Sequence, residues 1–355
     1  MQVAELVAPH PGTLELVNSW LEHHGISSSS VSRTHGGGWL TITDVPVPQA
    51  DALLGASYQL YRHTGTNGTE VILRTVGYAL PAELHAHVRT VVPTTYFGSP
   101  RVPQQTQRRG FVATVNATSG EPATALSSRT DEEPEYITPS ILRWLYNVAS
   151  YVPRAKNRNV LGIVGFLGMY PSQADLRSFV DLLRQDARPA RFSVKKINGG
   201  GFDPRLPHIE PNSNIQIATG IAYPTPLVFY SIGGVRILGP NDEAGKGDLW
   251  LAWLEYMIDL EKVPQTINIS YGSEELDIPF EYADGLCDLF AQLGARGVSI
   301  LASSGNDGVG SGDCKDDAGE VVFNVVFPAS CTCRFLLATS TQTQAQIAYQ
   351  IATFS

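Results

Sequence analysis

Hydrophobic positions repeat with helical and strand periods in two stretches of the chain, which a polar segment separates. In the first stretch, the spacing of Leu14, Val17 and Leu21 predicts a helix over residues 12–24. Further helices are predicted from about Val47 and over residues 82–88. Short strands are predicted at residues 29–33, 39–43, 56–61 and 71–75, with turns rich in Gly and Asn between them. We therefore predict a compact α+β unit over residues 1–97.

The polar segment covers residues 98–136. It is rich in Pro, Gln, Ser, Thr and charged side chains, and it offers little apolar surface to bury. We interpret it as a linker. The dibasic pair Arg108 and Arg109 and the acidic run at 131–134 are typical of places where proteolysis concentrates, so we expect a processing site here.

From residue 137 onward, predicted strands and helices alternate. Strands are predicted at residues 160–166, 191–197, 227–230, 265–270 and 298–302, and helices at 172–185, 212–221, 248–260 and 280–293. This alternation predicts an α/β fold with a doubly wound parallel sheet and helices on both faces. In such sheets the functional residues follow the carboxyl ends of the strands. Residues 332–355 are rich in Thr, Gln and Ala, and we interpret them as an atypical tail.

Composition and charge exclude some functions. Hydrophobic residues make up 43% of the chain and charged residues 17%, as in a folded globular protein. The net charge of −9 without a basic block argues against nucleic-acid and anionic-membrane partners, because proteins bind both mainly through Lys and Arg side chains. We expect no membrane span, because no stretch approaches about 20 apolar residues, and the first residues carry no secretory signal pattern.

All four cysteines fall in the last quarter of the chain, and their spacing fits no zinc pattern. We expect a disulfide in this region, with Cys314 and Cys331 as the candidate pair.

Two segments hold candidates for catalytic chemistry. Pro211 suits the first position of a helix, so Glu210 and Asn214 lie four residues apart on one face of its first turn. The helix dipole stabilises a carboxylate there, although an ordinary charge at a helix start fits the same pattern. Asn306 follows Ser303-Ser-Gly at the end of an apolar strand, where an amide can donate to a developing oxyanion. Taken alone, this pattern favours an ordinary turn at Asn306 over a catalytic role.

A series of short motifs occurs in one order along the chain. The motifs are 199–204 leading to Glu210, 223–226, 229–234, 253–256, 268–272, 294–299, 303–305 and 327–331. Together they resemble the sedolisin family of serine-carboxyl peptidases, which includes tripeptidyl-peptidases. Residues 47–54, 61–63, 78–81 and 93–97 are similar to the activation prodomain of that family. The chain is thus identified as a truncated member of the fungal type.

The resemblance implies a subtilisin-like α/β fold, whose sheet is expected to be incomplete over residues 137–331, after an α+β ferredoxin-like prodomain that lacks its start. It implies an extracellular, calcium-stabilised zymogen that cleaves peptide or protein substrates at acid pH. Its own prodomain would be a further partner. Glu210 matches the general base of the family, and two close carboxyls that share one proton operate in acid.

Three departures from the family pattern affect the expected activity. Asn214 stands where the family has the Asp that supports the base, and an amide cannot share a proton with Glu210. Asn306 stands at the oxyanion Asp, where an amide still donates. In the family, the nucleophilic serine belongs to a Gly-Thr-Ser stretch. The 355 residues contain no such stretch, and the calcium ligands expected from the family are also missing. We therefore expect an inactive chain, or a non-catalytic pseudopeptidase that binds peptides or inhibits active relatives.

Overall fold

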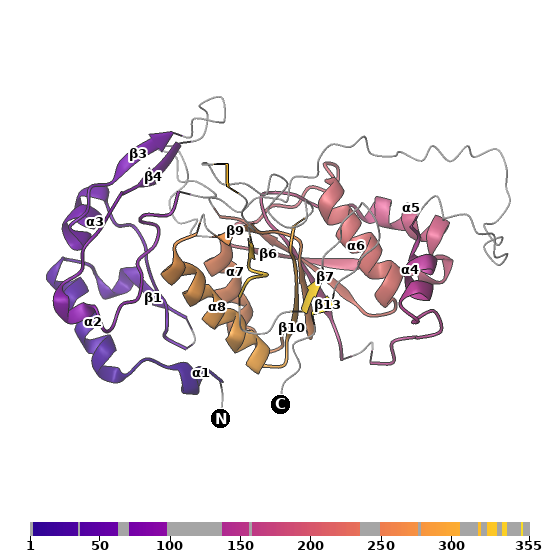
Figure 1. The fold of residues 1–355 in the computed structure, drawn as a ribbon, viewed down its shortest axis with the longest axis horizontal. Coiled ribbons are helices and arrows are strands. Elements are labelled where there is room, and N and C mark those ends of the chain that lie inside the picture. The colour runs from indigo at the N-terminus through magenta and orange to yellow at the C-terminus, as the bar shows by residue number, and fades with distance from the viewer. Residues whose placement is uncertain are drawn as a thin grey trace.

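The fold consists of an amino-terminal unit that lies beside an α/β unit, as Figure 1 shows. The computed structural model describes residues 3–34, 36–62, 71–97, 137–155, 158–234, 249–275, 278–305, 319–320 and 325–331, and the backbone of 336–338 and 349–350. Everything said below about the structure refers to these residues. Asn306, Cys314 and the predicted linker lie outside them.

The amino-terminal unit packs three helices and four short strands around a small apolar core. The elements are α1 (Val3–Val7), α2 (Pro11–His23), β1 (Val31–Arg33), β2 (Leu40–Ile42), α3 (Val47–Leu54), β3 (Gln59–Arg62) and β4 (Val71–Arg74). Its buried core includes Val17, Leu21, Leu53 and Leu84. Within the described residues β1 pairs only with β2 and β3 only with β4, so the predicted ferredoxin-like arrangement is not confirmed. The helix predicted over 82–88 is a single 3-10 turn, Ala82–Leu84.

The α/β unit is built on a mostly parallel sheet. Its strands are β5 (Leu161–Gly165), β6 (Phe192–Ile197), β7 (Leu227–Ile232), β8 (Thr266–Ile269), β10 (Ser299–Ser303), β12 (Leu336–Ala338) and β13 (Tyr349–Gln350). In the described part of the chain their order is β13-β12-β10-β8-β5-β7-β6, and only the β12–β13 pair is antiparallel. The predicted α/β fold with a parallel sheet is confirmed. The tail departs from its prediction, because it adds β12 and β13 to this sheet. A separate antiparallel pair joins β9 (Ser273–Glu274) to β11 (Val326–Phe327).

Helices cover both faces of the sheet because successive strand residues point to opposite sides. On β5, Ile163 packs with α5 (Gln173–Leu183) and α6 (Ile209–Ala222), whereas Val164 packs with α7 (Leu249–Asp259) and α8 (Phe280–Ala295). A short helix, α4 (Pro139–Leu145), lies against α6. Figure 1 shows α7 and α8 between the sheet and the amino-terminal unit.

An aromatic cluster fills the space between the sheet and helices α7 and α8. Its members are almost completely buried and pack mostly edge to face: Phe166, Trp250, Trp253, Phe290 and Phe327. Such packing favours a rigid arrangement, because ring edges meet ring faces at defined angles. The cluster therefore fixes the carboxyl end of β5, where Phe166 lies.

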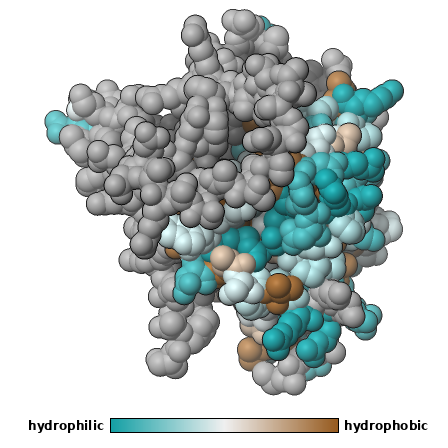
Figure 2. All heavy atoms as spheres, turned by 90° about the vertical axis from the view of Figure 1, so that its right-hand side faces the viewer, coloured by the Kyte–Doolittle hydropathy of each residue, from teal (hydrophilic) through white to brown (hydrophobic). Residues whose placement is uncertain are grey.

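The described surface is mostly hydrophilic at the end of the molecule that carries α4 and α5, as Figure 2 shows. Large exposed apolar side chains also occur there, among them Trp144 and Leu182. None of the helices in the described ranges has the length and apolar run that a membrane crossing requires.

Candidate functional site

The candidate base lies on the first turn of α6, at the edge of the sheet where the parallel strands end. Helix α6 begins at Ile209, three residues earlier than the sequence predicts, so Glu210 is already helical. Glu210 and Asn214 are both partly buried. Burial raises the pKa of the Tyr271 hydroxyl, and the nearby Glu210 carboxylate raises that pKa further. Tyr271 is completely buried just after β8, so Glu210 lies close enough to influence a buried group at this end of the sheet.

Asn214 is held by a chain of hydrogen bonds that starts on β8. The Asn268 amide nitrogen donates to Ser270 Oγ at 3.1 Å, and Ser270 Oγ donates to Asn214 Oδ1 at 3.1 Å. This order of donors and acceptors points the Asn214 oxygen toward Ser270. The Asn214 Nδ2 atom is buried and has no hydrogen-bond partner among the described residues. The site thus contains a buried amide donor where the family pattern requires an acid.

The adjacent strand brings a further buried hydroxyl to the same edge of the sheet. Ala302 of β10 pairs with Ile269 of β8, so Ser303 and Ser270 follow this pair side by side. Ser303 Oγ is buried and, within the described part of the chain, has no hydrogen-bond partner. Asn306 follows three residues later and lies outside the described residues, so its predicted role stays a prediction.

The start of α6 is anchored to the loop that follows β5. His208 N donates to the Tyr170 carbonyl at 2.9 Å, and Tyr170 N donates to His208 Nδ1 at 3.2 Å. Ser172 N donates to Asn212 Oδ1 at 2.7 Å, while Asn212 Nδ2 donates to Asp175 Oδ2 at 2.7 Å. His208 and Asn212, which make these bonds, lie two residues before and two residues after Glu210. The bonds therefore fix the helical turn that carries Glu210.

A cavity of about 360 Å³ lies beside this anchored turn. Its lining residues lie at or just after the ends of β5, β6 and β7: Leu167, Gly168, Tyr170, Gly199, Gly201, Ile232, Gly233 and Gly234. Glycine is required at Gly200, because a Cβ there would overlap the carbonyl oxygen of Ser231. The Ser231 hydroxyl in turn donates to the Gly201 carbonyl at 2.5 Å. The chain can thus pass from β6 across the end of β7 only because this segment lacks side chains.

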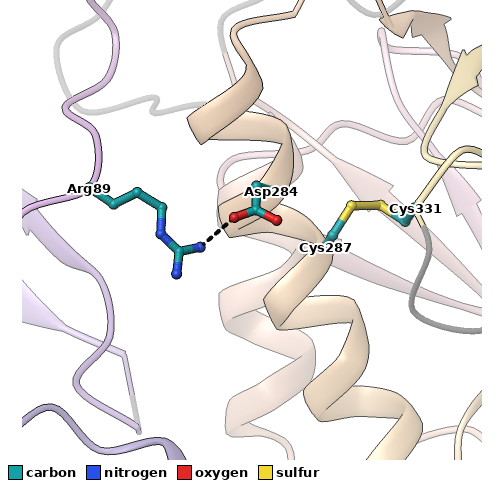
Figure 3. The surroundings of a disulfide bond; sticks show 4 residues. All are labelled: Arg89, Asp284, Cys287 and Cys331. Atoms are coloured by element: carbon teal, nitrogen blue, oxygen red, sulfur yellow. Dashed lines mark hydrogen bonds and ion pairs between the residues drawn. A yellow bond between two sulfur atoms is a disulfide. The ribbon is translucent and has the colours of Figure 1, made fainter.

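The predicted pairing of Cys314 with Cys331 is wrong. Cys331 forms its disulfide with Cys287 of α8, with a Cα–Cα distance of 5.5 Å, as Figure 3 shows. The two cysteines are 44 residues apart in the sequence. The fold packs the turn after β11 against α8, which brings Cys331 to Cys287. Only the tertiary structure reveals that neighbour.

Comparisons with known proteins agree with this picture over most of the chain. Residues 1–97 match the family described as Pro-kumamolisin, activation domain. The probable tripeptidyl-peptidase SED3 of Arthroderma benhamiae is 32% identical over 92% of this chain and 54% of its own length. The tripeptidyl-peptidase SED2 of Arthroderma otae is 30% identical over 93% of this chain and 55% of its own length.

The chain belongs to the sedolisin family. It spans about half the length of the curated relatives that it matches. A solved structure of Pseudomonas sedolisin, a serine-carboxyl proteinase complexed with two molecules of pseudo-iodotyrostatin, covers 56% of this chain and 52% of that chain. It is 18% identical with a TM-score of 0.38, so it adds no weight to the sequence matches.

The structure of this sedolisin chain brings Glu210 and Asn214 to one sheet edge with Ser270 and Tyr271. Sequence reasoning missed the residues that hold α6 in place, among them His208 and Asn212. Their partners come from the loop after β5, about 40 residues away in the sequence, so no local pattern marks them. The only available signal was Ser172, a residue type that often caps a helix and does cap α5.

Proposed function

We propose that this chain contains the base side of a serine-type peptidase site that cleaves peptide bonds at acid pH, with Glu210 as the general base. The observation that carries the proposal is the position of Glu210, which is partly buried on an anchored helix turn and close enough to raise the pKa of the buried Tyr271 just after β8. A carboxylate held there can take a proton from a hydroxyl that attacks a peptide carbonyl. Asn306 would donate to the oxyanion that then forms.

The 355 residues contain no Gly-Thr-Ser, the stretch that carries the nucleophile in the family. We propose that this polypeptide by itself does not hydrolyse peptide bonds. Its natural setting would be extracellular, and its partners would be a peptide substrate and its own residues 1–97. Among the described residues, no group of three or more His, Cys, Asp or Glu side chains could hold a metal ion, so we assign calcium no place and no step.

The test is hydrolysis by the purified 355-residue chain. A tripeptide-fluorophore substrate is incubated with it between about pH 3 and pH 5, near the pKa values of carboxyl groups. The Glu210→Gln variant serves as the matched control. We expect the same background signal from both proteins. Turnover that the Glu210→Gln variant loses would overturn the proposed inactivity and support the base. Equal turnover by both proteins would overturn both the proposed inactivity and the role of Glu210 as the general base.

A second candidate function is that of a non-catalytic protein that binds peptides or inhibits active relatives. The orientation of Asn214 favours it, because its oxygen is engaged by Ser270 and its nitrogen cannot release a proton. An Asn214→Asp variant of a longer polypeptide that contains the serine distinguishes the two functions. Activity that appears only with Asn214→Asp supports the non-catalytic function of the natural sequence. Equal activity with and without Asn214→Asp contradicts it.

A further inference from the structure

Positive charge is concentrated in one part of this acidic chain. Residues 137–197 contain ten Lys and Arg but only three Asp and Glu, whereas the whole chain contains 25 and 34. No Asp or Glu occurs in residues 137–174. The expectation against anionic-membrane partners rested on the net charge of the whole chain, which is −9. That value does not describe the surface that residues 137–197 contribute.

The strand directions bring six of these basic residues to one edge of the sheet. Strands β5 and β6 both pair with β7 in parallel, and parallel strands begin at the same edge. The segments before β5 and before β6 therefore lie at the edge opposite to the turn that carries Glu210. We call their arginines the basic edge: Arg143, Arg154, Arg158, Arg184, Arg188 and Arg191.

Arg143 connects the two segments of the basic edge. It is buried, and its Nη2 atom donates to the carbonyl of Ala149 at 2.6 Å and to that of Tyr151 at 3.0 Å. The pKa of Arg184 is lowered by burial, raised by Asp186 and lowered again by the charge of Arg143, so the two guanidinium groups lie close together. The segments before β5 and β6 are therefore neighbours in space.

Carboxylates within the described ranges balance only part of this charge. Arg184 Nη1 lies 3.1 Å from Asp186 Oδ1, and Arg188 Nε lies 2.8 Å from Asp181 Oδ1. Three exposed arginines form no ion pair with any described residue: Arg154, Arg158 and Arg191. The Arg184 Nε atom is buried and also has no hydrogen-bond partner there. A surface with this excess of positive charge attracts anions.

Large apolar side chains project from the surface beside the basic edge. Trp144 directly follows Arg143 and is 74% exposed, and Tyr151 and Val152 are 62% and 60% exposed. Leu182, near the end of α5, is 56% exposed. Figure 2 shows hydrophobic patches within the hydrophilic surface at this end of the molecule. A soluble polyanion would leave such side chains in water, whereas a bilayer interface accommodates Trp and Tyr rings as well as arginines.

We propose that the basic edge docks the protein on the surface of an anionic phospholipid bilayer, with Trp144 and Tyr151 placed among the lipid headgroups. Arginine suits this role because its guanidinium group binds phosphate oxygens through two parallel hydrogen bonds. The turn that carries Glu210 lies at the opposite edge of the sheet, so it faces away from the bilayer. The inference goes beyond the proposed peptidase function and does not depend on hydrolysis.

The test is sedimentation of the full 355-residue chain with vesicles of phosphatidylcholine, with or without phosphatidylserine. We expect binding only to the vesicles that contain phosphatidylserine, and we expect added salt to weaken it. Arg154→Gln together with Arg191→Gln should weaken binding by about 25-fold, because each basic side chain near an anionic surface contributes about fivefold. The matched control is Arg33→Gln together with Arg62→Gln, which removes the same charge from exposed residues of the amino-terminal unit. It should bind like the unsubstituted chain.

Tryptophan fluorescence tests whether apolar side chains enter the bilayer. Trp144 is the exposed one of the five tryptophans, since Trp250 and Trp253 are almost completely buried and Trp20 and Trp39 are partly buried. Lipids with brominated acyl chains should quench part of the emission of the bound chain, and Trp144→Phe should remove this quenching. Trp144→Ala should weaken binding severalfold, whereas Trp144→Phe should keep it.

Several results would overturn the proposal. It fails if the unsubstituted chain does not bind vesicles that contain phosphatidylserine, or if the two double variants bind equally well. It also fails if soluble dextran sulfate binds as tightly as the vesicles and Trp144 is not quenched, because the basic edge would then take a polyanion. Vesicle binding that appears only after the acidic run at 131–134 is replaced by Ser and Asn overturns it too, since the chain's own carboxylates would then be the occupant.

Discussion

A single hydrogen-bond direction decides what residue 214 can do. Ser270 donates to Asn214 Oδ1, and Asn268 donates to Ser270, so the oxygen of Asn214 is fixed as an acceptor. An aspartate in the same orientation would accept the same bond from Ser270 and could also hold a proton on its second oxygen. The amide instead places a permanent donor there. In the proposed site, the identity of residue 214 would therefore decide whether Glu210 has an acidic neighbour with which to share a proton.

The hydrogen bond from Ser270 predicts a stability effect. Ser270→Ala removes the donor to the partly buried Asn214 oxygen, and an unsatisfied polar group costs about 1–3 kcal/mol. We expect the free energy of unfolding in urea to fall by that amount. Ser178→Ala is the control, because the exposed Ser178 hydroxyl only donates to Ala174 O within α5. An equal effect of the two substitutions would contradict the role of Ser270.

The loop that leads to Glu210 contains an ion pair that persists in acid. Hydrogen bonds from Arg205 lower the pKa of Asp203 from 3.8 to about 2. Because the folded pKa is depressed, its contribution to stability is present above the unfolded value and is lost as the pH falls through about 2. The pair should therefore stay intact at the pH proposed for activity. In NMR, the Asp203 carboxyl should titrate with a midpoint near pH 2, and this midpoint should rise toward the ordinary value in Arg205→Ala. A midpoint near pH 4 in the unsubstituted chain would refute the prediction.

Residue identity alone could locate part of the site. Glu210 and Asn214 could be proposed from the sequence because helix spacing and the glycine run before them are local signals, and their catalytic roles stay predictions. Asn212 was not found, since its importance comes from Ser172 and Asp175 across the fold. Asn306 was proposed from the sequence and lies outside the described residues, so its role stays a prediction.

At the scale of elements, α6 carries the candidate base and depends on a close approach to α4. Gly220 of α6 is buried, and a Cβ there would lie 2.7 Å from Cγ of Pro139. Pro139 opens α4, whose amino end is capped by the Thr138 hydroxyl. The two helices can touch here only because residue 220 has no side chain.

This contact predicts opposite effects for two glycine substitutions in helices. Gly220→Ala should destabilise the fold by about 1–3 kcal/mol, because the new methyl group overpacks the contact with Pro139. Gly294→Ala meets nothing within 4 Å and should stabilise the fold by up to about 1 kcal/mol through helix propensity. Urea unfolding monitored by circular dichroism measures both. Stabilisation by Gly220→Ala would show that α4 and α6 do not pack as described.

Element types were predicted better than element ends. Alternating apolar residues and helical spacing predicted β5 to β8, β10 and α5 to α8, because each has a clear periodic face. The start of α6 was misplaced, since Ile209 is 75% exposed and gives no apolar signal. The strands β12 and β13 were missed, because their pairing with β10 and with each other compensates for a weak local pattern.

At the scale of the whole molecule, the disulfide joins α8 to the turn after β11. The bond between Cys287 and Cys331 closes a loop of 44 residues, which corresponds to about 4 kcal/mol in the chain-entropy treatment of the unfolded state. Cys287→Ser should lower the unfolding free energy by about 2–4 kcal/mol under oxidising conditions. Cys314→Ser serves as the comparison and should have a much smaller effect. The reverse ranking would restore Cys314 as the partner of Cys331.

The most direct test of Glu210 as general base is a rate measurement. Residues 1–331, carrying Asn214→Asp, are joined to the part of the Arthroderma benhamiae relative that lies beyond the match, and tripeptide release is followed between about pH 3 and pH 5. We predict turnover by this fusion and a loss of at least about 100-fold on Glu210→Gln, as expected when a general base is removed. Hydrolysis that proceeds at the same rate after Glu210→Gln contradicts the account.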